Sequence, residues 1–257
     1  MNFNDTLTNN YASFLNQIYR FVDVKKYTSD EDYKVKLNKK FGLEDKYSHD
    51  IIESCYWTLE DSEEAINNFL KFGNQGPTRY ENNLGEKYLR FFGVLNAINI
   101  QHLIIKELYD IFKVLNKESL IIDLKKVAII ELRNKLASHN VNYKDQSGFD
   151  FFKIARYSIR DNTDNVQFVS KENKRESFEL KNEIILFKEI LHKHLQIISE
   201  HLVSRYFKSE SKRFKELTEL TDLLNKKRNG AIISENLNGE YLVFEVDKSK
   251  IKDIINE

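Results

Sequence analysis

The residues of this chain best suited to chemistry lie together in the segment 131–140, which reads ELRNKLASHN. Arg133 offers a permanent charge and forked N–H donors that match a phosphate or carboxylate group. His139 offers an imidazole, and the unperturbed histidine pKa of about 6.5 suits it to proton transfer near neutral pH. With Asn134 as a further hydrogen-bonding group, the segment could hold an anion and move a proton beside it.

The spacing of Arg133 and His139 limits how they could meet. Six positions on a regular α-helix separate two side chains by roughly 120° around the axis and about 9 Å along it. A compact site therefore requires either that the helix loosens near Ser138 or that two copies of the segment meet across a twofold axis. Asn134 and Lys135 follow Arg133 directly and would face the same cleft.

A purely structural interpretation of the same residues is also open. Arg133 and Lys135 could be solvated charges that complement the dipole at the helix C-terminus, with Glu131 and Lys135 as a surface pair. His139 and Asn140 could be residues that cap this helix end.

The segment resembles the signature of the HEPN superfamily (higher eukaryotes and prokaryotes nucleotide-binding), an α-helical bundle with an Arg–x(4–6)–His motif. In that family a polar residue often follows the arginine. Here Arg133, Asn134 and His139 fill these positions, with five residues between Arg133 and His139. Residues 87–98, KYLRFFGVLNAI, are also similar to a bacterial HEPN-like pattern. The resemblance covers about residues 82–207 and leaves out residues 1–75 and the C-terminal hairpin.

The resemblance implies a metal-independent endoribonuclease in an abortive-infection, phage-defence or toxin–antitoxin context. In this reaction the ribose 2′-OH attacks the adjacent phosphate. His139 would transfer protons, Arg133 would stabilise the charge on the phosphorus centre, and Asn134 would orient the histidine or the phosphate. Four further candidates for substrate binding are Lys135, Ser138, Asn140 and Tyr143. Some HEPN toxins carry a tyrosine two positions after the histidine, whereas position 141 is Val here, which weakens a role for Tyr143.

The resemblance also implies a homodimer with a composite site, because active HEPN dimers are arranged in this way. RNA is the expected partner, a protein partner such as an antitoxin is a further one, and no DNA, cofactor or metal is expected. The alternative is a non-catalytic HEPN-like module that binds a nucleotide, RNA or a protein. A third interpretation is a helical dimer with a structural role.

Other candidate residues have simpler interpretations. His102 falls on an apolar helix stripe, which indicates a hydrogen-bonded core histidine. His194 and His201 are seven residues apart, which favours a partly exposed helix face over a zinc site. His49 and Glu53 are four residues apart and could share a ligand, with a surface pair as the alternative. Basic residues at 226–228 and across the expected β-insert could contact RNA, but interleaved acids favour a solvated face.

The elements that position the 131–140 segment should be long helices, because the chain holds only 1 Pro and 8 Gly. Apolar residues from Leu84 to Phe112 recur in steps of three and four, which predicts one long amphipathic helix capped by Asn82 or Asn83. A polar connection at residues 116–119 and a second helix over residues 120–137 complete an antiparallel helix hairpin.

The rest of the chain predicts shorter elements. The expected pieces are short N-terminal helices within residues 5–70 (the second over 48–57, the third starting at 61 or 62), strands at 149–159, 166–170 and 175–180 with a turn at 161–165, helices around 184–202 and 209–227, a hairpin of strands 231–235 and 241–246, and a short terminal helix. The resulting fold class is mainly α: a HEPN-like helical bundle on a long antiparallel helix hairpin, with a small β-insert at about residues 149–180 and a C-terminal β-hairpin.

The segment with the only Pro, residues 73–78, predicts a domain boundary. We expect an N-terminal helical region over residues 1–75, a HEPN-like core over residues 80–207, and a C-terminal helix with a β-hairpin over residues 208–257.

Composition narrows the function further. The 257 residues hold 40 basic and 40 acidic side chains, so bulk charge would not attract nucleic acid and any anion site must be local. Residues 1–75 hold 9 basic and 13 acidic side chains, and the remainder holds 31 and 27. The single cysteine, Cys55, excludes a disulfide framework and should be a buried thiol. The sequence lacks phosphate-loop, dinucleotide-binding and nucleophile-elbow motifs. With no long apolar run and no signal-peptide pattern, we expect a cytoplasmic protein without a membrane role.

Overall fold

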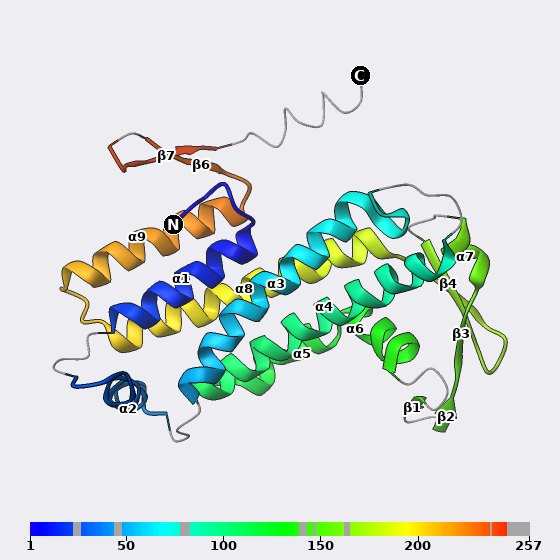
Figure 1. Cartoon of the computed structure of the whole chain (residues 1–257), viewed down its shortest axis with the longest axis horizontal. Helices are drawn as coiled ribbons and strands as arrows, with labels where there is room; N and C mark the ends of the chain where they lie inside the picture. Colours follow the sequence, from blue (N-terminus) through cyan, green and yellow to red (C-terminus); the bar gives the residue numbers. More distant parts are fainter. Residues whose placement is uncertain are drawn as a thin grey trace. The chain divides into compact units, whose positions relative to one another are not determined.

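The computed structural model describes residues 1–22, 27–43, 48–77, 83–138, 143–145, 148–161, 165–236 and 238–245. This part of the chain is mainly helical, with small antiparallel sheets (Figure 1). The chain divides into two compact units. The terminal unit combines Met1–Tyr56 with Leu195–Glu257, and the central unit is Trp57–His194. The domain boundaries expected near residues 75 and 207 stay predictions of the sequence.

The terminal unit contains elements from both ends of the chain. They are α1 (Leu7–Phe21), α2 (Asp30–Phe41), the start of α3 (Ser48–Phe72), the end of α8 (Leu180–Tyr206), α9 (Lys212–Arg228) and the hairpin β6 (Ile232–Glu235)–β7 (Tyr241–Phe244). The Thr6 and Ser29 side chains accept the backbone N–H of Asn9 and Asp32, which caps α1 and α2. Helix α1 packs against α9, and Phe14 of α1 is fully buried.

Helix α3 corrects one expectation. The sequence predicted two helices, one over residues 48–57 and another from Asp61 or Ser62, whereas α3 runs unbroken from Ser48 to Phe72. Ser62 does not cap a new helix, because its hydroxyl donates to the carbonyl of Leu59 within the same helix. Its side chain is 5% exposed, so this bond satisfies a buried hydroxyl without breaking α3.

The central unit is built around α4 (Leu84–Ile111), and this long helix confirms the prediction. The Asn83 side chain accepts the N–H of Glu86 and caps its first turn, as one of the two expected caps. The apolar stripe faces the core, since Phe91, Ile98 and Ile105 are fully buried.

The single second helix expected over residues 120–137 is wrong. The chain forms α5 (Lys117–Lys125), turns at Val127, continues as α6 (Ala128–Arg133), and ends in a π-helix over Asn134–Ser138. Val127 has an extended backbone (ψ 125°) and is 6% exposed, so the break places a β-branched side chain in the core. The hairpin arrangement of these helices with α4 stays a prediction.

The β-insert is present and follows the segment that resembles the HEPN motif. It comprises β1 (Tyr143–Asp145), β2 (Gly148–Asp150), β3 (Phe152–Ile154), α7 (Arg156–Arg160), β4 (Asn165–Ser170) and β5 (Arg175–Glu179). The strands β3, β4 and β5 form the expected three-stranded antiparallel sheet in that order, and β1 pairs with β2. The first predicted strand, 149–159, is divided between β2 and β3. It also ends early because residues 156–160 form α7, where the Ser158 hydroxyl donates to the Ala155 carbonyl and accepts the Gln167 N–H.

The later helices and the C-terminal hairpin match their predicted positions. Helix α8 includes the expected segment 184–202, α9 begins at Lys212 where a helix over 209–227 was expected, and β6 pairs with β7 in antiparallel register. Gly239 adopts a left-handed conformation (φ 78°) in the hairpin loop, which an asparagine–glycine turn favours. The predicted terminal helix, and part of the turn expected at 161–165, lie outside the described residues. In the described part, no helix is both long and apolar enough to cross a membrane.

Candidate functional site at the end of helix α6

Arg133 ends α6 at the point where the helix changes type. The next five residues, Asn134–Ser138, form a π-helix with i→i+5 hydrogen bonds. Short π-helical turns are rare in proteins as a whole, but those that occur often lie at functional sites. The helix therefore loosens before His139, which is one of the two ways in which the sequence allowed a compact site.

Arg133 and Asn134 are in direct contact. The Arg133 guanidinium donates through Nη1 to Asn134 Oδ1 at 3.1 Å, and both residues are half-buried. Among the described residues, Arg133 forms no ion pair with a carboxylate. Within the described part its charge has no counter-charge, and the bond engages Asn134 Oδ1 and leaves the amide N–H₂ group without a partner there.

Lys135 is engaged differently. Its ammonium group pairs with Glu131 at 2.8 Å and with Glu176 at 3.5 Å, and it lies over the rings of Phe152 and Phe168 at 5.1 and 5.7 Å. Burial lowers the pKa of Lys135, but the two carboxylates outweigh burial, and the pKa is raised. The Glu131–Lys135 pair that the structural interpretation expected is present. Lys135 thus joins α6 to the β3–β4–β5 sheet, a role that does not require a substrate.

The remaining candidates of the segment are described less fully. Ser138 is the last residue of the π-helix. His139 and Asn140 lie outside the described residues. Tyr143 lies in β1, opposite Asp150.

His102 on α4 is a buried neighbour of this site. It is 8% exposed, as expected of a core histidine, but neither ring nitrogen has a hydrogen-bond partner among the described residues. Burial, followed by the charges of Lys106, Lys125 and Arg133, lowers the pKa of His102 to about 4. The ring is therefore neutral at physiological pH, and it adds no positive charge beside Arg133.

A second buried histidine corrects an expectation. His194 was predicted on a partly exposed helix face, yet its side chain is 0% exposed. Its Nε2 lies 3.0 Å from Asp123 Oδ1, and its Nδ1 lies 2.7 Å from the Tyr109 hydroxyl. With Asp123 as a carboxylate, Nε2 carries the proton and the tyrosine donates to Nδ1. The sequence did hold a signal, because His194 falls three residues after Leu191 and four before Ile198 on the apolar stripe of α8.

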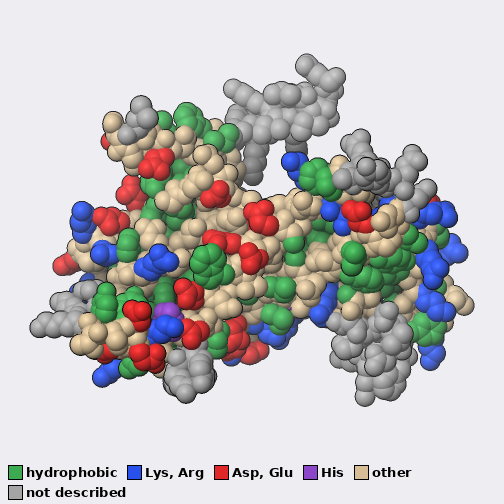
Figure 2. Space-filling model, in the orientation of Figure 1, with side chains coloured by type: hydrophobic (Ala, Val, Ile, Leu, Met, Phe, Trp, Pro, Cys, Tyr) green, Lys and Arg blue, Asp and Glu red, His purple; other side chains and the backbone are tan. Residues whose placement is uncertain are grey.

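Basic residues elsewhere are mostly engaged or solvated. Figure 2 shows Lys and Arg side chains over the part of the surface that the β3–β4–β5 sheet forms, where Arg160 and Lys174 pair with neighbouring acids. In the terminal unit, Lys227 donates to the carbonyls of Phe3 and Asp5. Lys227 therefore links the N-terminal segment to α9 through hydrogen bonds.

Of the described residues, one group has the composition and spacing to hold a metal ion: His49, Asp50 and Glu53 in the terminal unit. None of the described residues around Arg133 belongs to such a group. Comparisons with protein-family models, with curated proteins and with solved structures find no match to this chain.

Proposed function

We propose that this protein is a metal-independent endoribonuclease of HEPN type that acts in the cytoplasm. The observation that supports this most is the state of Arg133. It is half-buried, it has no carboxylate partner among the described residues, and it orients Asn134 at the start of a π-helix. The sequence places His139 directly after this turn. A cation without a counter-charge, close in sequence to a histidine, is suited to phosphate-ester cleavage.

In this proposal each residue has a defined task. His139 accepts the proton of the ribose 2′-OH as that oxygen attacks the adjacent phosphorus, and the 5′-oxygen leaves with a proton from a second donor. Arg133 stabilises the negative charge that builds up on the phosphate oxygens. Asn134, whose oxygen is already held by Arg133, donates its amide N–H to a phosphate oxygen or to the histidine ring. The products are a 2′,3′-cyclic phosphate and a free 5′-hydroxyl.

A homodimer would supply the second proton donor. Two copies of the motif that meet across a twofold axis bring two histidines and two arginines to one site, as in active HEPN dimers. The start of α4 presents an apolar surface for such contact, since Leu89 is 75% exposed and Tyr88 stacks on Phe92. An antitoxin or another protein partner that covers the site would keep it inactive in the cell, in the toxin-like or phage-defence role.

The proposal is tested with purified protein and a labelled RNA in the presence of EDTA. We expect cleavage to cyclic-phosphate ends, and His139→Ala should lower the rate by at least about 100-fold, the smaller end of the range for general acid–base groups. His201→Ala, on the half-buried surface of α8, is the matched control and should cleave at the wild-type rate. Light scattering on the same samples measures the expected dimer, and circular dichroism confirms that the variants are folded. Equal cleavage by wild type and His139→Ala would contradict the proposal.

The alternative is a non-catalytic HEPN-like module that binds RNA, a nucleotide or a protein. The observation that favours it concerns Lys135, one of the residues expected to bind the substrate of a nuclease. Its charge is already compensated by Glu131 and Glu176, so it is less suited to that role. If RNA or a nucleotide binds the wild-type protein, is not cleaved, and is lost from Arg133→Ala, the binding module is the correct interpretation.

A further inference from the structure

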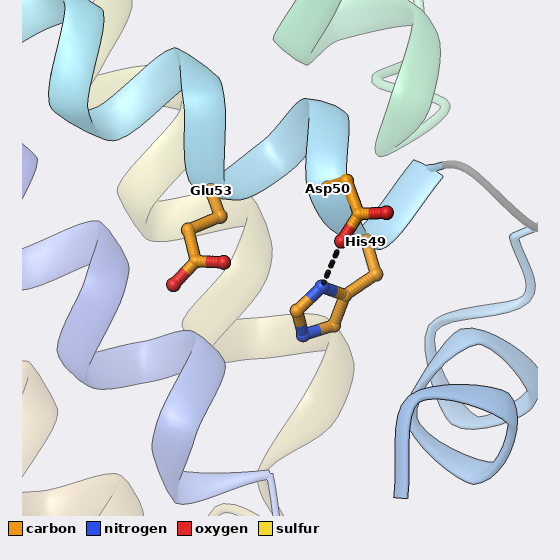
Figure 3. Close-up of side chains that lie close together, drawn as sticks. All are labelled: His49, Asp50 and Glu53. Atoms are coloured by element: carbon orange, nitrogen blue, oxygen red, sulfur yellow. Dashed lines mark hydrogen bonds and ion pairs between the residues drawn. The ribbon is translucent and has the colours of Figure 1, made fainter. Parts of the chain in front are cut away.

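A second polar cluster lies in the terminal unit, in the first two turns of α3. Figure 3 shows the His49 ring and the Glu53 carboxylate on the same side of this helix, as residues four apart should be. Asp50 reaches the ring from the adjacent position, with its Oδ1 3.3 Å from His49 Nδ1. One ligand atom from each of the three side chains lies within 4.8 Å of the others. The His49 side chain is only 10% exposed, so its ring is held in place by the fold.

A cavity of about 300 Å³ adjoins this cluster, with His49 and Glu53 in its lining. Two of its other lining residues, Tyr19 from α1 and Tyr56 from α3, are 6% and 4% exposed. Both hydroxyl groups are buried and lack a hydrogen-bond partner among the described residues. Burial above all, followed by Tyr33, Glu53 and Asp50, raises the pKa of the Tyr19 hydroxyl, which places it near these carboxylates. Since buried polar groups are normally satisfied, these two hydroxyls beside the cavity leave hydrogen-bonding capacity that a water molecule or a polar ligand would fill.

We propose that His49, Asp50 and Glu53 bind a divalent transition-metal ion, Zn²⁺ in preference to Mn²⁺, with an open coordination position toward this cavity. The ligand set is one imidazole and two carboxylates, which suits these ions, and the Irving–Williams order favours Zn²⁺ over Mn²⁺. The site lies in the terminal unit and is independent of the proposed RNA cleavage, which proceeds without metal.

The geometry needs one adjustment. Ligand atoms around a tetrahedral Zn²⁺ lie about 3.4 Å apart, given bonds of about 2.0–2.2 Å. The 3.3 Å between His49 Nδ1 and Asp50 Oδ1 already matches this separation. Glu53 has to move inward by up to about 1.4 Å, and its side chain is exposed and forms no ion pair among the described residues.

The surrounding charges favour a cation, with one competitor. Asp30, Asp50 and Glu53 supply three carboxylates, against two cations, Arg20 and Lys34. Lys34 Nζ pairs with Asp50 Oδ1 at 2.9 Å, so a bound metal ion must displace it from that oxygen. Lys34 is therefore the residue whose removal should tighten metal binding.

The three protein ligands leave a fourth position for water or for an anionic group of a small ligand. Tyr19 and Tyr56 line the same cavity, with their hydroxyl groups buried in its wall. This arrangement, with an open position facing a cavity, differs from that of structural zinc sites, which are closed by four protein ligands.

The test is calorimetric titration of tag-free, chelator-treated full-length protein with Zn²⁺, and with Mn²⁺ for comparison. We expect one ion per chain, with Zn²⁺ binding more tightly. His49→Gln and Glu53→Gln should each weaken Zn²⁺ binding by at least about tenfold, the lower bound for loss of a group that supports a metal site. Lys34→Met should strengthen it several-fold. His201→Gln is the matched histidine control and should leave it unchanged.

Each result decides the question. Absence of Zn²⁺ binding to the wild type would overturn the proposal, as would binding that Glu53→Gln and Lys34→Met leave unaltered. Glu53 and Lys34 are on the surface, so these two variants remain informative if His49→Gln fails to fold. RNA cleavage measured in EDTA tests the proposed nuclease without bound metal, so failure of the metal site and failure of the nuclease are distinguished.

Discussion

The end of α6 and the start of α3 each place polar residues beside a cation, and each segment directly precedes or includes a histidine. The charges at the two places favour ligands of opposite sign. At α6 the guanidinium of Arg133 contacts a neutral amide, so its charge is uncompensated among the described residues. At α3 the ammonium of Lys34 contacts a carboxylate of a cluster in which acids outnumber bases. In the two proposals, the difference between Asn134 and Asp50 beside the cation decides that the first site takes an anion and the second a cation.

The largest expected effect is at Arg133. Replacing it by alanine removes the charge that would stabilise the phosphate in the transition state, and such losses reduce the rate by about 100- to 1,000-fold. Arg133→Lys should recover only part of the rate, because an ammonium group lacks the forked donors. Single-turnover RNA cleavage in EDTA measures both.

Arg175→Ala, on an exposed strand of the β-insert, is the control for a general loss of positive charge. If it slows cleavage as much as Arg133→Ala, bulk attraction to RNA explains the activity and the comparison with α3 fails.

The second prediction concerns burial and pH. His102 is buried, and its folded-state pKa of about 4 lies below the unfolded value of about 6.5. The neutral ring is favoured in the fold, so its contribution to stability is present above about pH 6.5 and is lost as the pH falls toward 4. At 1.36 kcal/mol per pKa unit, at most about 3 kcal/mol is lost.

Denaturant unfolding of wild type and His102→Leu between pH 7.5 and 4.5 tests this. The leucine variant should lose less stability on acidification, although His194, whose pKa burial also lowers, keeps part of the slope. His201→Leu should follow the wild-type curve. Parallel curves for wild type and His102→Leu would show that His102 is not the group that titrates.

Local pattern predicted the elements well where neighbouring residues decide them. The apolar period and the Asn83 cap located α4, and the Asn238–Gly239 pair located the terminal hairpin. The break at Val127 has no glycine or proline to announce it, because core packing rather than turn chemistry determines it. Ser62 looked like a cap, but a bond to Leu59 kept it inside α3.

The candidate sites show the same difference between features set by neighbouring residues and features set by the fold. Arg133, Asn134 and the loosened helix could be inferred from one short segment. The contact of Lys135 with Glu176, 41 residues later, could not, since the fold of the β-insert creates it. The pair His49 and Glu53 was visible as a helical spacing, but Tyr19 and the cavity come from another helix. His194 was misread because a polar residue on an apolar stripe was assigned to the surface.

The smallest effects come from exchanging the two residues that distinguish the sites. Asn134→Asp gives Arg133 a carboxylate at the position where Asn134 Oδ1 now lies 3.1 Å away. The ion pair should compete with the phosphate and slow RNA cleavage by about tenfold, with the free energy of unfolding changed by about 1 kcal/mol or less, since water still reaches the half-buried pair. Asp50→Asn removes one carboxylate from the α3 cluster and releases Lys34, and it should weaken Zn²⁺ binding by about tenfold. Each variant is the control for the other, because Asp50→Asn should leave cleavage unchanged and Asn134→Asp should leave Zn²⁺ binding unchanged. If either substitution alters both measurements, charge at these two positions does not decide which ligand each site accepts.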